Sequence, residues 1–277
     1  MPRNDRPAAR NESTVVPDAD RRSAKPATAA SWERAGWERD AADATTEGVG
    51  PSPQNTQERD TTAAPPKRRQ APEPVTRELH QAVGLRRGAR LEQTLMEASK
   101  AYERGRHGDA LRMLRPLIDE AADVAAVREL AGLCLYQQEK WAAAITQLNR
   151  FVELTGSVEQ NPVLADCHRA LRHYRQVEAL WEELSASSPA ADLVAEGRIV
   201  MAGALGDQGK LEDAIRLLER GPVTPKRAKT HHLRLWYALA DLYERAGDVP
   251  RARELFKRIR VVDPAMADVD DRLRQLG

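Results

Sequence analysis

The chain has 277 residues and a formal net charge of +1, with 41 % hydrophobic, 31 % charged and only 4 % aromatic side chains. A net charge so close to zero gives no electrostatic bias toward nucleic acid or an anionic membrane. Two cysteines, Cys134 and Cys167, are too few for a disulfide framework and lack the spacing of metal ligands.

No apolar run approaches the roughly 18 residues that a membrane-spanning helix needs. The first residues also lack the apolar core of a secretion signal. We therefore expect a cytoplasmic protein without a membrane contact. Arginine outnumbers lysine 35 to 8, which is typical of a bacterial genome rich in G and C.

Residues 1–85 do not resemble a folded domain. They hold 10 of the 17 prolines, and their 13 basic and 13 acidic residues balance one another. Large aliphatic side chains are nearly absent, so the segment buries too little apolar surface to offset the entropy of ordering. The sequence predicts a disordered tail of mixed charge over 1–85.

The tail contains a duplicated Trp-Glu-Arg, at Trp32–Arg34 and Trp37–Arg39. Tryptophan anchors are enriched at binding hot spots, so Trp32 and Trp37 are candidates for a short motif that orders on a partner. Chance duplication in a drifting tail is the alternative. A basic triplet, Lys67–Arg69, is too short for a nucleic-acid patch and fits a solvated linker better.

A short helix is predicted over Thr76–Val83, with Thr76 as its N-cap, and the helical period becomes continuous from Leu91. Five units then follow, each with two apolar helical stretches around a turn. Their expected bounds are 91–124, 125–158, 158–191, 195–228 and 233–266, followed by a capping helix over 267–277.

The residues in the turn slots of the five units are spaced by 34, 33, 37 and 38 positions. They are Gly105, Glu139, Arg172, Gly209 and Gly247. The longer intervals predict loop insertions near Ser185–Asp192 and Lys229–His232. The third unit is degenerate, because Arg172 and Val177 replace the usual small residues.

The fifth unit carries the sharpest pattern. Its apolar and small residues follow the spacing W-x2-L-G-x2-Y…A-x3-F…P, with alanine in place of the glycine. The matching residues are Trp236, Leu239, Ala240, Tyr243, Gly247, Ala252, Phe256 and Pro264. This stretch resembles the tetratricopeptide repeat family, and weaker matches extend the resemblance over about 91–277.

The resemblance implies an all-α, right-handed α-solenoid of about five helix–turn–helix repeats. It also implies a concave groove lined by the first helix of each unit. The residues that the resemblance places in partner-contact positions of that groove are Tyr102, Leu133, Tyr136, Arg169, Arg234, Tyr237 and Asp241. Tyrosines, aliphatics and mixed charge fit an extended or helical segment with apolar and aromatic side chains better than an acidic chain terminus.

A search for chemistry finds no catalytic, cofactor or metal site. The stretch Gly203–Lys210 has five residues between its glycines where a phosphate loop has four, and Leu211 follows where Ser or Thr is needed. Cys167 and His168 are adjacent and diverge on a helix, and His231–His232 has no second ligand cluster. We expect no enzyme and no small-molecule substrate.

The favoured function is a protein–protein adaptor. The groove binds a segment of one partner, and the tail recruits a second protein or acts as a tether. In one variant the tail tryptophans occupy the chain's own groove. A regulatory protein that binds RNA or other nucleic acid is the alternative, although the near-zero net charge argues against a large phosphate footprint.

Overall fold

The computed structural model describes residues 73–187 and 189–277, and all regular elements in these ranges are α-helices. The helices are α2 (Glu73–Val83), α3 (Leu85–Glu103), α4 (His107–Glu120), α5 (Ala125–Gln137), α6 (Trp141–Thr155), α7 (Asn161–Ala170), α8 (Tyr174–Ser187), α9 (Ala191–Asp207), α10 (Leu211–Glu219), α11 (Thr230–Arg245), α12 (Val249–Val262) and α13 (Val269–Gln275). The predicted all-α repeat solenoid is confirmed. The duplicated tryptophans and the Lys67–Arg69 triplet lie outside the described residues.

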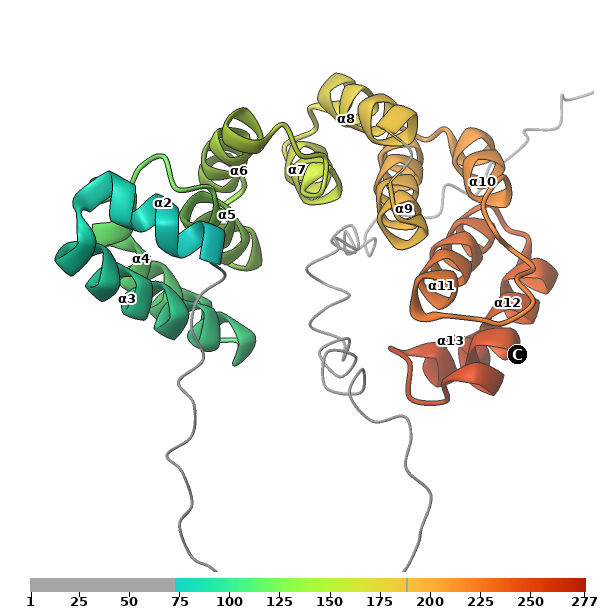
Figure 1. The fold of residues 1–277 in the computed structure, drawn as a ribbon. Coiled ribbons are helices and arrows are strands. Elements are labelled where there is room, and N and C mark those ends of the chain that lie inside the picture. The colour runs from blue at the N-terminus through green and yellow to red at the C-terminus, as the bar shows by residue number, and fades with distance from the viewer. Residues whose placement is uncertain (1–72, 188) are drawn as a thin grey trace, which may run out of the picture.

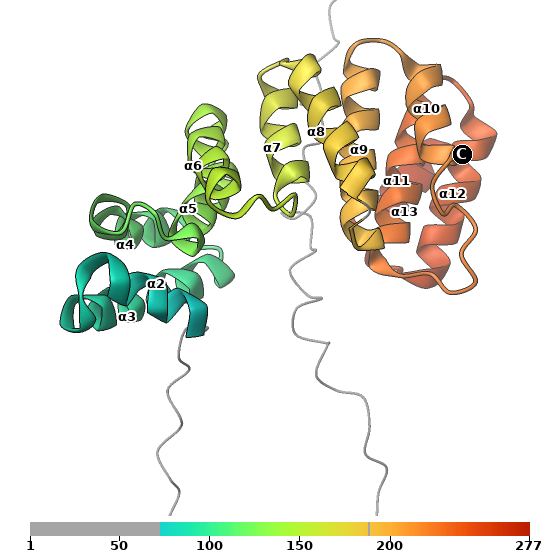
Figure 2. The ribbon, with the colours of Figure 1, turned by 45° about the horizontal axis from the view of Figure 1, so that its top comes forward.

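The helices pair as α3–α4, α5–α6, α7–α8, α9–α10 and α11–α12, and the pairs follow one another along an arch (Figure 1). Helices α5, α7, α9 and α11 lie toward the inner side of the arch, and α6, α8, α10 and α12 toward its outer side. Figure 2 shows α7, α8 and α9 side by side in the middle of the stack, between the two ends of the domain.

One residue in each turn between paired helices has a left-handed backbone. Its φ is 69° at Gly105, 58° at Glu139, 60° at Arg172, 78° at Gly209 and 81° at Gly247. These are the five turn-slot residues of the sequence pattern. Glycine adopts this conformation without strain, whereas a residue with a Cβ pays a steric penalty.

Glu139 and Arg172 tolerate the left-handed backbone because the bonds around it are complete. The Glu139 amide donates to the Tyr136 carbonyl at 2.8 Å, and the Lys140 amide donates to the Leu135 carbonyl at 2.9 Å. This pair of bonds is the Schellman motif, which satisfies the last carbonyls of a helix. The same two bonds recur around Arg172, so the degenerate third unit keeps the turn of its neighbours.

The helical domain begins earlier than the sequence indicated. The short helix predicted over Thr76–Val83 is present as α2, although 1–85 was otherwise assigned to the tail. It begins at Glu73, so Thr76 lies inside the helix rather than at its N-cap. Leu79 is fully buried against the α3–α4 core, and α3 approaches His80 closely at Gly88. One short amphipathic segment cannot fold alone, so α2 depends on its packing against α3.

The two predicted loop insertions are also corrected. Near 185–192 the chain stays helical up to Ser187 and resumes at Ala191, and the extra length enters α9, which has 17 residues against 10 in α7. The second insertion lies at 220–229, before the predicted position. Gly221, Pro222 and Pro225 follow the end of α10 directly, and such residues do not continue a helix.

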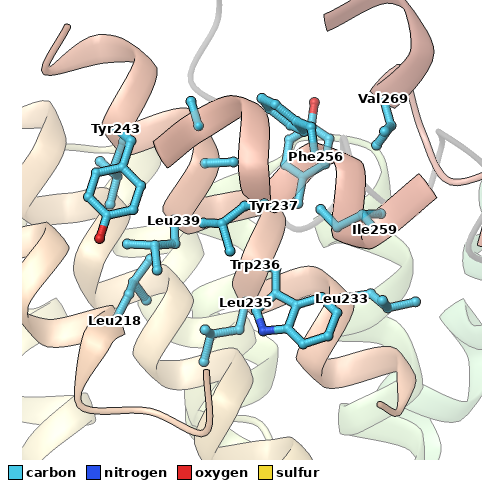
Figure 3. Packing of buried hydrophobic residues seen from close by; sticks show 14 of the residues in the cluster. Leu218, Leu233, Leu235, Trp236, Tyr237, Leu239, Tyr243, Phe256, Ile259 and Val269 are labelled. Carbon is cyan, nitrogen blue, oxygen red and sulfur yellow. The ribbon is translucent and has the colours of Figure 1, made fainter. Parts of the chain in front are cut away.

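The apolar core is largest at the two ends of the arch. One cluster joins α2 to α5, and another joins α9 to α13. Figure 3 shows the second cluster, where Tyr237 meets Phe256 edge to face with ring centroids 5.4 Å apart. Between them lie two smaller clusters, one built around Tyr136 and Cys167 and the other around Val177 and Val200.

We expect Phe256→Ala to lower the free energy of unfolding by about 3–5 kcal/mol, because its fully buried ring leaves a cavity between α11 and α12. Val261→Ala on the same helix should change it by less than about 0.5 kcal/mol, since Val261 is 82 % exposed. Urea denaturation of both variants measures the difference. Equal losses would contradict the placement of Phe256 in the core.

Candidate partner-binding face

A chain of polar contacts connects three successive inner helices, and we call it the α5–α7–α9 polar chain. The Tyr136 hydroxyl on α5 donates to Asp166 Oδ2 on α7 at 2.9 Å. One turn along α7, Arg169 Nη1 lies 3.7 Å from Asp166 Oδ1. Arg169 Nε then donates to Asp207 Oδ2, at the end of α9, over 2.6 Å. A second bond, from Arg169 Nη2 to Asp207 Oδ1 at 3.2 Å, makes this contact bidentate.

Arg169 remains charged although it is buried. Its side chain is 8 % exposed, and the Asp166 side chain is not exposed at all. Burial alone lowers the pKa of Arg169, but the hydrogen bond to Asp207 and the charges of Asp166 and Asp207 outweigh it, so the net pKa is raised. A buried charge of this kind requires its partners, because an uncompensated one is very costly.

Gly203 on α9 provides the space for the Arg169 side chain. A Cβ added at Gly203 would lie 2.4 Å from Arg169 Nη1 and 2.5 Å from its Cζ. Gly203 also begins the stretch Gly203–Lys210, whose glycine spacing does not match a phosphate loop. The structure shows instead a mid-helix glycine whose missing side chain lets a guanidinium cross from one repeat to the next.

Further polar contacts continue the linkage toward the C-terminus. Arg234 Nη2 on α11 lies 2.8 Å from Glu196 Oε2 on α9. Arg272 on α13 reaches back to α11, 3.0 Å from Asp241 and 2.8 Å from Glu244. Asp268, just before α13, accepts a hydrogen bond from the Tyr237 hydroxyl.

Three of the seven residues predicted to contact a partner are buried. Tyr136, Arg169 and Tyr237 are 1, 8 and 5 % exposed, and each uses its polar atoms on a neighbouring repeat or on the segment that leads into α13. Their prediction as open groove contacts is corrected. The physical reason is that the inner helices pack closely enough for long polar side chains to span from one to the next.

The other four are partly exposed. The Tyr102 ring stacks on His107 with centroids 5.1 Å apart, and Leu133 is half-buried on α5. Arg234 and Asp241 are 21 and 32 % exposed and belong to the ion pairs just described. Trp32 and Trp37 lie outside the described residues. The structure therefore brings predicted residues of successive repeats close together. Tyr136, Arg169 and Tyr237 hold the helices in place rather than face a partner.

The sequence did not point to Glu196 or Arg272, both of which hold inner-face residues in place. Each pairs with a residue about 30 or more positions away along the chain. A charge by itself does not reveal such a partner. The only available signal was the helical spacing of the C-terminal segment, which predicted a cap but not the reach of Arg272 back to α11.

The candidate nucleophiles and metal ligands do not form a reactive site in the described residues. Burial raises the pKa of Cys134 to about 12, and burial together with the Asp166 charge raises that of Cys167. His168 and His173 face each other, with their Nδ1 atoms 3.4 Å apart. Within residues 73–187 and 189–277 no three His, Cys, Asp or Glu side chains gather as a metal site. No helix in these ranges is long and apolar enough to cross a membrane.

Comparison with known proteins agrees with this geometry. Two family models, both described as tetratricopeptide repeat, match residues 95–158 and 233–273. The first match spans the α3–α6 pairs, and the second spans α11–α13. These two stretches of the chain are tetratricopeptide repeats. No protein of curated function matches it.

Solved structures share the tetratricopeptide fold at low sequence identity. A thermophilic tetratricopeptide protein from Thermus thermophilus is 16 % identical with a TM-score of 0.52, covering 67 % of this chain and 98 % of its own. A variant of a putative kinesin light chain from Podospora anserina, with nearly identical tetratricopeptide-like repeats, is 17 % identical with the same TM-score. It covers 62 % of this chain and 94 % of its own. At such identities the likeness concerns the fold alone.

We expect Gly203→Ala to destabilise this tetratricopeptide domain by about 1–3 kcal/mol, because the new methyl group displaces Arg169 from Asp207 within a buried network. Gly108→Ala is a matched control: it also lies in a helix, but nothing is within 4 Å of its added Cβ. That change should be neutral or stabilising by up to about 1 kcal/mol. Chemical denaturation gives the sign of the change in unfolding free energy for each variant. A stabilised Gly203→Ala variant would contradict the close approach of Arg169 to Gly203.

We expect the thiols of Cys134 and Cys167 to be unreactive in the native protein. Their raised pKa values leave little thiolate at neutral pH, roughly a thousandfold less for Cys134 than for an ordinary thiol. An aromatic disulfide reagent at pH 7.5 should modify neither cysteine within minutes and both after denaturation in guanidinium. A rapidly reacting thiol in the folded protein would show that α5 or α7 is not packed as described.

Proposed function

We propose that this tetratricopeptide protein is a non-catalytic adaptor that binds a segment of a partner protein along the inner side of its arch. Tetratricopeptide repeats generally mediate contacts between proteins. The observation that carries the proposal is the alignment of α5, α7, α9 and α11 along one side of the arch (Figure 1). A repeat solenoid uses such a side as an extended binding surface.

The polar chain supports this role because it fixes the spacing of the inner helices before a partner arrives. Contacts from Tyr136 through Arg169 to Asp207 connect α5, α7 and α9. A preorganised surface loses less conformational freedom on binding than a mobile one. The buried tyrosines and Arg169 thus act as supports of the proposed face, not as its contacts.

The proposed contacts are the partly exposed residues of the inner helices α5 and α11, together with Tyr102 on α3. Leu133 and Tyr102 would supply apolar and aromatic surface, and Arg234 with Asp241 would supply charge at the C-terminal end. This composition favours a peptide with apolar side chains and mixed polarity, bound as an extended or helical segment. We place the adaptor in the cytoplasm, and we propose that the segment with Trp32 and Trp37 is its second binding element.

Capture of partners from a native lysate tests the inner face. Leu133→Arg puts a charge on half-buried α5 surface, and Asn149→Arg puts the same charge on an exposed position of the outer helix α6. We expect a partner that wild type and Asn149→Arg retain and that Leu133→Arg loses by at least tenfold. Thermal melting of both variants verifies that each is folded.

Two further results separate the two binding elements. Equal capture by the Leu133 and Asn149 variants would remove α5 from the binding face. Loss of the same partner from a Trp32→Ala/Trp37→Ala variant, with Leu133→Arg unaffected, would transfer binding from the solenoid to the N-terminal segment.

A further inference from the structure

The longest connection between the described helices is strongly basic. Residues 220–229 join α10 to α11 and contain Arg220, Lys226, Arg227 and Lys229 but no acidic residue. Figure 2 shows this connection as the long loop beyond α10. Four like charges repel one another, so a segment of this composition needs a reason to be held in one place.

The connection is tied to the domain at several points. The Trp236 indole donates its N–H to the Val223 carbonyl at 2.8 Å, and Arg258 Nη2 donates to the same oxygen at 3.3 Å. A Cβ at Gly221 would lie 2.7 Å from Leu235 and 3.3 Å from the Arg198 side chain. The four charges are therefore presented from a loop whose N-terminal half is anchored on α9, α11 and α12.

Arg198 and Arg258 add two positive charges beside the loop. Arg198 donates to the Leu217 carbonyl at 3.1 Å and lies over the Trp181 ring at 5.3 Å. Arg258 lies over the Trp236 ring at 4.4 Å. Burial and the positive charge of Arg220 both lower the pKa of Arg198, so these two cations repel one another.

These cations contrast with the other arginines of the domain, most of which pair with carboxylates. Among residues 73–187 and 189–277, no carboxylate lies within ion-pair distance of any of the six. Two acids of this region accept hydrogen bonds elsewhere: Glu219 from the Tyr243 hydroxyl, and Asp192 from the Leu193 amide. The six residues are Arg198, Arg220, Lys226, Arg227, Lys229 and Arg258.

Exposed apolar surface adjoins this charge. Only three large hydrophobic side chains are exposed in the described chain, and two of them, Val261 and Val262, are 82 and 49 % exposed at the end of α12. They follow Arg258 by three and four positions, so they share its face of the helix. We call the six cations with Val261 and Val262 the basic–apolar patch.

We propose that residues 32–47 of this same chain bind the basic–apolar patch. That segment, Trp32 to Glu47, has five acidic and two basic residues and both N-terminal tryptophans. Its carboxylates complement the 220–229 loop, and Trp32 and Trp37 cover Val261 and Val262. Tryptophan and arginine, which this pairing brings together, are both enriched at binding hot spots.

The chain between the two sites is long enough. Residues 48–72 can span up to about 85 Å when extended. Helix pairs stack about 10 Å apart, so the four steps from the first pair to the pair that contains α12 amount to about 40 Å.

This inference deepens the proposed role of the Trp32–Trp37 segment as a second binding element and does not depend on the inner face. It assigns that element an intramolecular site. An acidic partner that uses the patch must then displace residues 32–47, which makes the segment a built-in competitor.

Carbodiimide coupling of carboxylates to lysine amines in the full chain tests the proposal. Mass spectrometry should find Lys226 or Lys229 joined to acidic residues within 33–47 at least tenfold more often than exposed Lys100 or Lys140. An equimolar mixture of ¹⁵N-labelled and unlabelled chains identifies links within one chain. About 1 M NaCl should reduce the links, because it screens the charges.

Reversing the charge of arginines in the loop leaves Lys226 and Lys229 available for coupling. Arg220→Glu/Arg227→Glu should reduce the links at least tenfold, and adding Asp40→Arg/Asp43→Arg should restore them. The control Arg104→Glu/Arg115→Glu reverses two exposed charges on α3–α4 and should leave the links unchanged. Trp32→Ala/Trp37→Ala should reduce them at unaltered charge.

Three outcomes would overturn the proposal. Links no more frequent at Lys226 and Lys229 than at Lys100 would mean that the segment does not occupy the patch. If about half of the links join a labelled to an unlabelled chain, as random pairing in an equimolar mixture gives, the patch belongs to a second copy. Equal loss in the reversed and control variants would mean that the effect is one of overall charge. None of these experiments changes Leu133. Failure of this proposal would therefore not contradict the inner-face proposal, which the Leu133→Arg capture experiment tests separately.

Discussion

The guanidinium of Arg169 sits between two carboxylates, Asp166 on its own helix and Asp207 on the next repeat. Buried ion pairs contribute little net stability, because desolvation offsets most of the Coulomb attraction, yet losing one partner is very costly. Such a contact therefore acts mainly as a constraint on geometry. Hydrogen bonds are directional, so they fix how α7 is placed relative to α5 and α9 more narrowly than apolar contact alone.

The distribution of the core shows why this constraint matters. Large apolar clusters fill the two ends of the arch, whereas the middle has two small ones. The third repeat also has the weakest repeat pattern. Its continuity with its neighbours depends on Tyr136, Arg169 and the space at Gly203, and the orientation of the inner side follows from these contacts.

On the outer surface, charge pairing differs from one region to another. Arginine is abundant, and across most of the domain its charge is matched locally, as at Arg216 with Asp213 or Arg251 with Asp248. Matched charges are screened and of little energetic consequence. The 220–229 connection departs from this pattern through unmatched cations beside two exposed valines. Inner face and basic–apolar patch are thus separate surfaces, one shaped by repeat packing and the other by an insertion.

Local pattern was sufficient to predict the repeat architecture. Apolar spacing and turn residues identified five helix pairs, and the five turn-slot residues all have a left-handed backbone, including Glu139 and Arg172. This works because a Schellman turn depends on residues within one helix end. The sequence could not show that α2 joins the domain, since Leu79 becomes buried only against α3.

For the candidate site, the sequence determined which helices would face inward but not what their side chains would do. Tyr136, Arg169 and Tyr237 occupy the expected slots, yet tertiary packing buries them against partners 30 or more positions away. Helical periodicity specifies the direction of a side chain from its own axis. Whether that direction ends in solvent or on a neighbouring helix depends on the distance between repeats, and only the folded stack determines that distance.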